Sequence, residues 1–181
     1  MKRVLLLFLC VSLVQGVFAK DYFSKTYTKT SEHVIVTSTP LGYIHFEYNC
    51  KQDLREKTGK MGYIRLKIDV LETGYSHKDG KTANIYDHDY DQTINAIETI
   101  LKEIETIPTV STYFTFFNDI PNTDFKLLVQ YLTDDNKWSC YVSLDGEMVE
   151  ITCGQLKTII NAIQDAKKFK EEIDKGNQST N

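Results

Sequence analysis

Hydrophobic and polar residues alternate in eight short runs along the chain, separated by segments rich in turn-forming residues. The runs lie at residues 33–38, 43–49, 62–71, 83–87, 110–117, 125–132, 137–144 and 148–153. Alternation with a period of two is typical of strands that bury one face and expose the other. The intervening turns, such as Asp145-Gly146, favour antiparallel pairing of neighbouring strands. We therefore predict eight strands.

Two further segments show the periodicity of amphipathic helices. The first runs from about residue 90 to residue 106 and ends before Pro108, because proline disfavours helical geometry in the residue before it. The second runs from about residue 154 to residue 173. Their apolar stripes comprise Ile94, Ile97, Ile100, Leu101 and Ile104, and Leu156, Ile159, Ile160, Ile163 and Ala166. One apolar stripe per helix predicts that each helix lies on a sheet.

The two halves of the sequence repeat one order of elements. The tetrapeptide that begins at Ile94 recurs at Ile160, and four alternating runs precede each copy. We predict an α+β fold: a largely antiparallel sheet of about eight strands with two helices on one face, built from two ββββα units. The half-repeats cover about 33–107 and 110–174, within one domain over 20–174.

The alternation also assigns the two faces of each strand. The predicted core faces carry Ile64, Leu66, Ile68 and Val70; Phe125, Leu127 and Val129; Trp138, Cys140, Val142 and Leu144; and Val149, Ile151 and Cys153. The opposite faces are polar but rich in tyrosine. Rigid, amphipathic tyrosines suit recognition of a protein or a sugar ring, and they also have high strand propensity. The candidate partner-binding residues are Tyr43, Tyr63, Tyr113 and Tyr141.

The N-terminus has the pattern of a secretory signal peptide. Two basic residues precede a short apolar run, and a small residue, Ala19, stands where cleavage is expected. The run is too short for a stable membrane anchor. Cleavage would take the formal net charge from −4 to about −6, which disfavours nucleic acid as a partner. We predict an exported protein, periplasmic or secreted, with a disordered tail over 175–181.

Three cysteines, Cys50, Cys140 and Cys153, remain after cleavage. Cys140 and Cys153 flank the Asp145-Gly146 turn. A type I′ turn would place Cys140 opposite Ile151 and diagonal to Cys153, whereas a type II′ turn one residue later would place the two cysteines face to face. The first register favours buried thiols and the second a Cys140–Cys153 disulfide.

The segment YDHDYDQTINAIE, residues 86–98, resembles the ligand spacing of a calcium-binding EF-hand loop. Asp87, Asp89 and Asp91 occupy its first three ligand positions. The sixth position needs a left-handed conformation that glycine adopts freely, and here it is Gln92. A weak calcium site at the three aspartates is therefore one interpretation.

The alternative interpretation of this acidic cluster needs no metal. Asp89 and Gln92 have the spacing of a capping box, and Asp87 and Asp91 would lie at the favourable end of the helix dipole. A helix over 90–106 would also place Glu98 about 10 Å from Asp91, too far to share an ion. As a strand residue, His88 would point away from its acidic neighbours.

No sequence motif identifies catalytic residues or a bound cofactor. We therefore expect an exported binding or inhibitor-like domain that recognises a protein or glycan partner, and not an enzyme. The alternatives are a cation-dependent hydrolase and a calcium-stabilised envelope protein, both centred on residues 87–91.

Overall fold

A computed structural model describes residues 24–53, 60–70, 81–117 and 125–178. The strands are β1 (Ser24–Thr37), β2 (Gly42–Asp53), β3 (Lys60–Val70), β4 (Thr82–Tyr86), β5 (Thr112–Phe117), β6 (Lys126–Leu132), β7 (Lys137–Leu144) and β8 (Glu147–Ile151). The helices are α2 (Tyr90–Glu103) and α3 (Leu156–Gln178). The predicted signal peptide lies outside the described residues.

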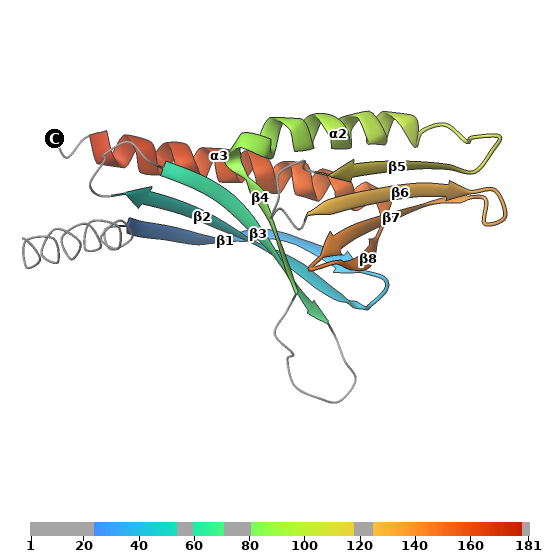
Figure 1. Ribbon diagram of the computed structural model, residues 1–181, viewed down its shortest axis with the longest axis horizontal. Helices are drawn as coiled ribbons and strands as arrows, with labels where there is room; N and C mark the ends of the chain where they lie inside the picture. The colour runs from blue at the N-terminus through green and yellow to red at the C-terminus, as the bar shows by residue number, and fades with distance from the viewer. Residues whose placement is uncertain (1–23, 54–59, 71–80, 118–124, 179–181) are drawn as a thin grey trace, which may run out of the picture.

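The fold belongs to the α+β class and consists of two ββββα units, as the sequence predicts. The strands form two antiparallel sheets, sheet A in the order β1-β2-β3-β4 and sheet B in the order β5-β6-β7-β8 (Figure 1). The two sheets meet where the turn after β1 bonds to β8. The Ser38 N–H donates to the Glu150 carbonyl, and the Glu150 N–H donates to the Thr39 carbonyl, both over 2.8 Å.

Burial along the strands follows the predicted alternation. In β3, Ile64, Leu66 and Ile68 are buried, and the intervening residues face outward. Val70 differs from the prediction because it lies at the end of the strand and is exposed. The predicted inner residues of β7 and β8 are buried or half-buried.

Strand β1 begins well before its predicted start at residue 33. Its first half, SKTYTKTSE, pairs with β2 from Ser24↔Asp53 to Thr30↔Glu47, and the register then shifts through a bulge before Val34. Most of these residues are exposed. The added length therefore comes from backbone pairing and has no hydrophobic pattern.

The two units enter their helices in the same way. A 3-10 turn precedes α2 at Asp87–Asp89, and another precedes α3 at Cys153–Gln155, the equivalent place in the second unit. Helix α2 ends at Glu103, slightly before its predicted end. Helix α3 extends to Gln178, so 175–178 belong to a helix that is longer than predicted.

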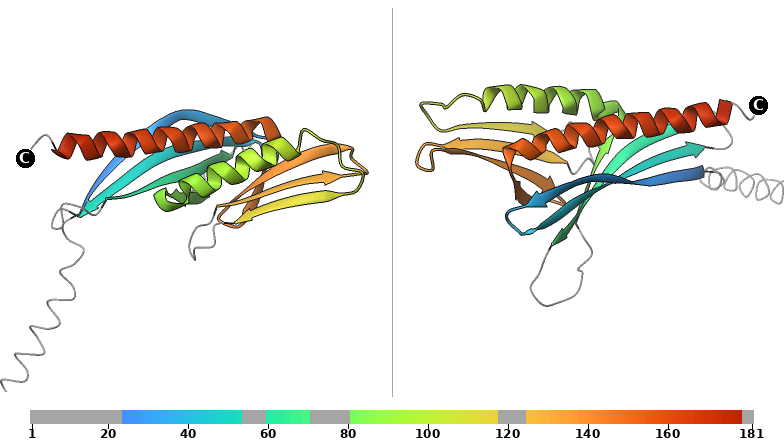
Figure 2. Two further views of the ribbon diagram at one scale, coloured as in Figure 1. Left: turned by 90° about the horizontal axis from the view of Figure 1, so that it is seen from above. Right: turned by 180° about the vertical axis from the view of Figure 1, so that it is seen from behind.

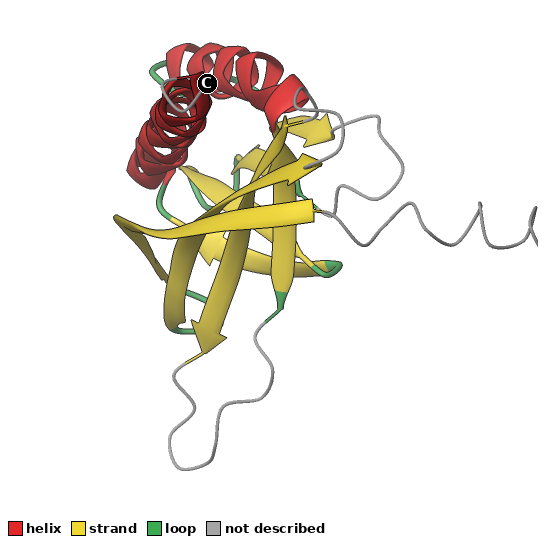
Figure 3. Cartoon of the chain, turned by 90° about the vertical axis from the view of Figure 1, so that its left-hand side faces the viewer, coloured by secondary structure: helices red, strands yellow, loops and turns green. Residues whose placement is uncertain are grey.

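Both helices lie on the same side of the strands (Figure 3). Helix α3, from the second unit, runs along sheet A of the first unit and contacts β1, β2 and β3, while α2 lies over sheet B (Figures 1 and 2). The buried residues of both halves form one hydrophobic cluster. Each unit thus supplies the helix that covers the other unit's sheet.

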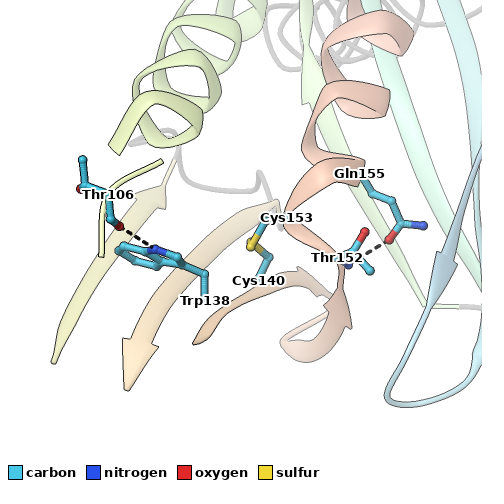
Figure 4. Close-up of a disulfide and its surroundings, with 6 residues drawn as sticks. All are labelled: Thr106, Trp138, Cys140, Thr152, Cys153 and Gln155. Carbon is cyan, nitrogen blue, oxygen red and sulfur yellow. Dashed lines mark hydrogen bonds between the residues drawn. A yellow bond between two sulfur atoms is a disulfide. The ribbon is translucent and has the colours of Figure 1, made fainter. Parts of the chain in front are cut away.

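The start of α3 is held by a capping box and a disulfide (Figure 4). Gln155 accepts a hydrogen bond from the Thr152 N–H over 2.9 Å, and its amide donates to the Val36 carbonyl over 3.0 Å. Cys140 pairs with Ile151, as a type I′ turn predicts, yet Cys140 and Cys153 form a disulfide with Cα atoms 5.4 Å apart. The bridge is within reach because Cys153 lies in a 3-10 turn and does not continue β8.

We expect Thr152→Ala to lower the free energy of unfolding by about 1 kcal/mol, because the turn that begins α3 would lose its side-chain cap. Denaturant unfolding of the variant and the parent protein would measure the difference. Asn161→Ala, at an exposed position within α3, is the control and should have little effect. Equal stabilities for Thr152→Ala and the parent would contradict the role of this cap.

Candidate functional site

The four candidate tyrosines lie on two different sheets. Tyr43 and Tyr63 face outward from sheet A, on the side opposite the helices, whereas Tyr113 and Tyr141 face outward from sheet B. Tyr141 pairs with Leu128 and Glu150 and is half-buried. The sequence grouped the four by strand face, and the structure divides them into two pairs.

The outer face of sheet A carries the larger set of amphipathic and charged side chains. We use the name outer face A for Tyr43, His45, Glu47, Tyr63, Arg65, Lys67, Asp69 and Tyr86. The strand register places Arg65 between Glu47 and Asn84, and Tyr63 between Asn49 and Tyr86. These are adjacent cross-strand neighbours, so their side chains form one surface.

Arg65 lies near the centre of outer face A and has a partner on each side. Its guanidinium carbon lies 5.7 Å from the centre of the Tyr63 ring, and its Nη1 lies 4.0 Å from Glu47 Oε1. Asn49 donates to the same Glu47 oxygen over 2.9 Å. Arginine stacked on an aromatic ring and paired with a carboxylate loses part of its rotamer freedom before any partner binds.

An aromatic row continues from Tyr63 to the 3-10 turn before α2. The ring centres of Tyr63 and Tyr86 are 5.7 Å apart, and Tyr86 stacks on His88 at the same distance. Tyr86 and Arg65 are not among the candidates predicted from the sequence. Both residues occupy outward positions in the alternating runs 83–87 and 62–71, and this alternation is the sequence signal that could have identified them.

The opposite end of outer face A holds a second polar group. His45 Nε2 lies 3.3 Å from Asp69 Oδ2, and Lys67 Nζ lies 3.8 Å from Asp69 Oδ1. Tyr43 packs beside His45 with ring centres 6.3 Å apart. Cationic and anionic side chains therefore nearly balance each other across outer face A.

The three aspartates proposed for a cation site have three different surroundings. Asp87 Oδ2 accepts hydrogen bonds from the Lys170 ammonium and from the Gly62 N–H, the latter over 3.2 Å. Asp91 is 85 % exposed on its side chain and pairs with Lys167. The two lysines both come from α3, so these carboxylates attach α3 to the start of α2.

Asp89 is the N-cap residue of α2, but its side chain makes no capping hydrogen bond. The predicted capping box with Gln92 is wrong. The reason is the preceding 3-10 turn, which gives Asp89 a nearly helical backbone (φ −99°, ψ −6°) in place of the extended conformation of a capping residue. Its Oδ2 is buried without a hydrogen bond, and His88 Nε2 lies 3.4 Å from it.

The same 3-10 turn changes the position of His88. A strand would have pointed its ring away from both acidic neighbours, whereas the turn places Nδ1 3.7 Å from Asp87 and Nε2 3.4 Å from Asp89. Within the described parts of the chain, no group of three or more His, Cys, Asp or Glu side chains could hold a metal ion. Asp87, Asp89 and Asp91 therefore do not form such a group in this arrangement.

The Asp87 carboxyl has a lowered pKa. Burial raises this pKa, but the hydrogen bonds from Lys170 and from the Gly62 N–H outweigh the effect of burial, so the pKa lies below its ordinary value. Gly62 permits the approach, since a Cβ atom there would lie 3.3 Å from Lys170 Cδ and 3.6 Å from Asp87 Cβ. Asp87 is thus a structural carboxylate that stays ionised at neutral pH.

Comparison with known proteins gives no match, because no family model fits the chain and no curated protein or solved structure resembles it. Neither of the described helices combines the length and apolar character needed to span a membrane.

We expect the Asp87–Lys170 pair to make stability depend on acid pH. The folded-state pKa lies below the unfolded one, so the contribution is complete above the unfolded pKa near 3.8 and is lost as pH falls through the folded pKa. Asp87→Asn should lower the free energy of unfolding by about 2 kcal/mol at pH 7 and by less at pH 2. Denaturant unfolding across this pH range would measure both effects.

The control for this series is Asp91→Asn, which removes an exposed ion pair on the same helix interface. Exposed pairs contribute about 0 to 1 kcal/mol, so this variant should stay close to the parent at every pH. A loss as large as that of Asp87→Asn would refute the special role of the half-buried pair.

Calcium should not stabilise the protein, since Asp87 and Asp91 are paired with lysines and the Asp89 carboxylate is buried beside His88. Thermal melting with calcium at about 1 mM, and then with chelator, should give the same midpoint. A calcium-dependent rise that Asp89→Ala and Asp91→Ala each abolish would show that the three aspartates rearrange into a cation site.

Proposed function

We propose that the chain is an exported binding domain that recognises a protein partner through outer face A. The N-terminal signal pattern and the Cys140–Cys153 disulfide support export, because disulfides persist in oxidising compartments. The observation that carries the proposal is the Arg65 group, in which Tyr63 and Glu47 hold an arginine on the face that the helices leave uncovered.

The composition of outer face A is that of a protein interface. Tyrosine and arginine are among the residues most enriched where binding energy is concentrated in such interfaces. Arg65 keeps 43 % of its side-chain surface accessible, and Tyr43 is 38 % exposed. They are therefore available for contact and are not part of the core.

The contacts within outer face A also favour binding. Each partly immobilised side chain reduces the conformational entropy that association must remove. Arg65 is held by Tyr63 and Glu47, and His45 is held by Asp69 and lies beside Tyr43. The polar groups between these anchors can form hydrogen bonds at the rim of an interface.

The dimensions of this surface distinguish a protein from a single sugar ring. The outward residues of β3 form successive rows along outer face A, from Tyr63 through Arg65 and Lys67 to Asp69. At a rise of about 3.4 Å per residue, these rows extend for roughly 20 Å. A ring of one sugar would cover one or two of these side chains, whereas a protein surface can contact all the rows at once.

We expect Arg65→Ala to weaken binding of the partner at least about tenfold, since it removes the central side chain of the face. The mature protein would be used to isolate partners from the exported fraction, and each candidate would then be purified and its dissociation constant measured by calorimetry. Tyr63→Ser should give a similar loss. Glu98→Ala, exposed on α2, is the matched control and should bind like the parent.

Two outcomes would overturn the proposal. A purified partner that binds Arg65→Ala and Tyr63→Ser as tightly as the parent would place the interface elsewhere. If glycans from the exported fraction still bound the mature protein after all other protein had been removed from them, the partner would be a carbohydrate and not a protein. Circular dichroism of each variant confirms that a loss of binding is not a loss of fold.

A further inference from the structure

Strand β5 forms one end of sheet B, and among the described strands it pairs with β6 alone. The pairing is continuous from Thr112↔Tyr131 to Phe117↔Lys126, without a bulge. An end strand presents unpaired N–H and C=O groups along its free side, which can pair with a further strand. In the view from above, β5 lies at the margin of the molecule (Figure 2, left).

The other end strands carry features that hinder such pairing. The free side of β8 is bonded at Glu150 by the turn after β1, and the start of β4 bonds to the hairpin turn at Asp145 through Thr82. Strand β1 contains a bulge, and lysines occur along its exposed half. Bulges, lysines and covering segments are the usual means by which sheet edges avoid pairing.

Strand β5 has none of these protective features in its sequence. Its residues are TYFTFF, with no charge, proline or glycine and with three phenylalanines and one tyrosine. Tyr113 is 72 % exposed and Thr115 is also exposed, and both lie on the outer face of sheet B. Short uncharged segments of high strand propensity at a sheet edge are those that pair most readily.

Three exposed apolar residues belong to the segments next to the end of sheet B where β5 begins. Ile107 is 75 % exposed, Val110 66 % and Leu132 41 %. The end of β6 is held beside the start of β5, because Ser111 Oγ lies 3.2 Å from both the Thr133 hydroxyl and the Thr133 N–H. These apolar side chains add exposed apolar surface near the free edge of β5.

We propose that β5 pairs antiparallel with β5 of a second copy of this chain, so that two B sheets join into one continuous sheet. Antiparallel pairing of a strand with its own copy obeys two-fold symmetry, in which each surface contacts itself. A charged patch would repel its own copy, and the chain carries a net charge of −4. The uncharged β5 edge avoids that repulsion, and it offers no charged group to a charged foreign partner.

The proposed β5–β5 contact is small, so we expect the dimer to be weak. The short β5 edge and the adjacent apolar side chains bury less than a standard interface, and contacts of this size are weak or transient. We therefore expect a dimer with a dissociation constant of about 10 to 100 µM. This inference does not depend on the proposed function, because outer face A and β5 belong to different sheets.

Sedimentation equilibrium of the mature protein over about 5 to 500 µM tests the proposal. The parent should pass from monomer to dimer over this range. Thr115→Lys and Tyr113→Lys each place a positive charge on β5 beside its own copy, and each should raise the dissociation constant at least about tenfold. The melting temperature and circular dichroism of each variant show whether it is folded.

Leu41→Lys is the matched control, because Leu41 is also an exposed apolar residue but lies in the turn after β1. It should dimerise like the parent. A parent protein that stays monomeric at the highest concentration would overturn the proposal. So would a dimer that Leu41→Lys weakens as much as folded Thr115→Lys does, since the contact would then not be specific to β5.

Discussion

The fold depends on one constraint: each four-stranded sheet has an apolar face that its own unit does not cover. Burying apolar surface contributes about 25 cal/mol per Å² to the free energy of unfolding. An inner face without a covering helix would stay in contact with water and would lose this contribution. The chain meets this constraint by exchange, with α3 on sheet A and α2 over sheet B. The two units therefore share one hydrophobic cluster, and neither sheet is complete without the other half.

Polar contacts fix how the two halves meet, although each adds little energy. Exposed ion pairs contribute about 1 kcal/mol or less. Each pair forms only when the two elements that carry its residues lie in one particular relative position. Asp165 of α3 pairs with His33 in the bulge of β1 over 3.1 Å, and Lys170 pairs with Asp87 at the start of α2. These contacts join α3 to β1 and to the start of α2. The helices leave the opposite sides of both sheets uncovered.

The candidate site was predictable in part. Alternation assigned Tyr43 and Tyr63 correctly to an outward face, because side chains on successive strand residues point to opposite sides. It could not show that Tyr113 and Tyr141 belong to another sheet, since a face assignment holds only within its own strand. The surroundings of His88 and Asp89 also escaped prediction, because a short 3-10 turn redirected both side chains.

By itself, the sequence determined the strands, the helices, their order and the α+β class, because each follows from local periodicity and turn residues. Polar edge segments such as SKTYTKTSE lack that signal, and so the long first half of β1 arises only from pairing with β2. Tertiary structure alone decided the division into two sheets, the exchange of helices and the Cys140–Cys153 bridge. Each of these three features depends on contacts between residues that are separated in the sequence. The local sequence pattern around such residues does not reveal whether they come into contact.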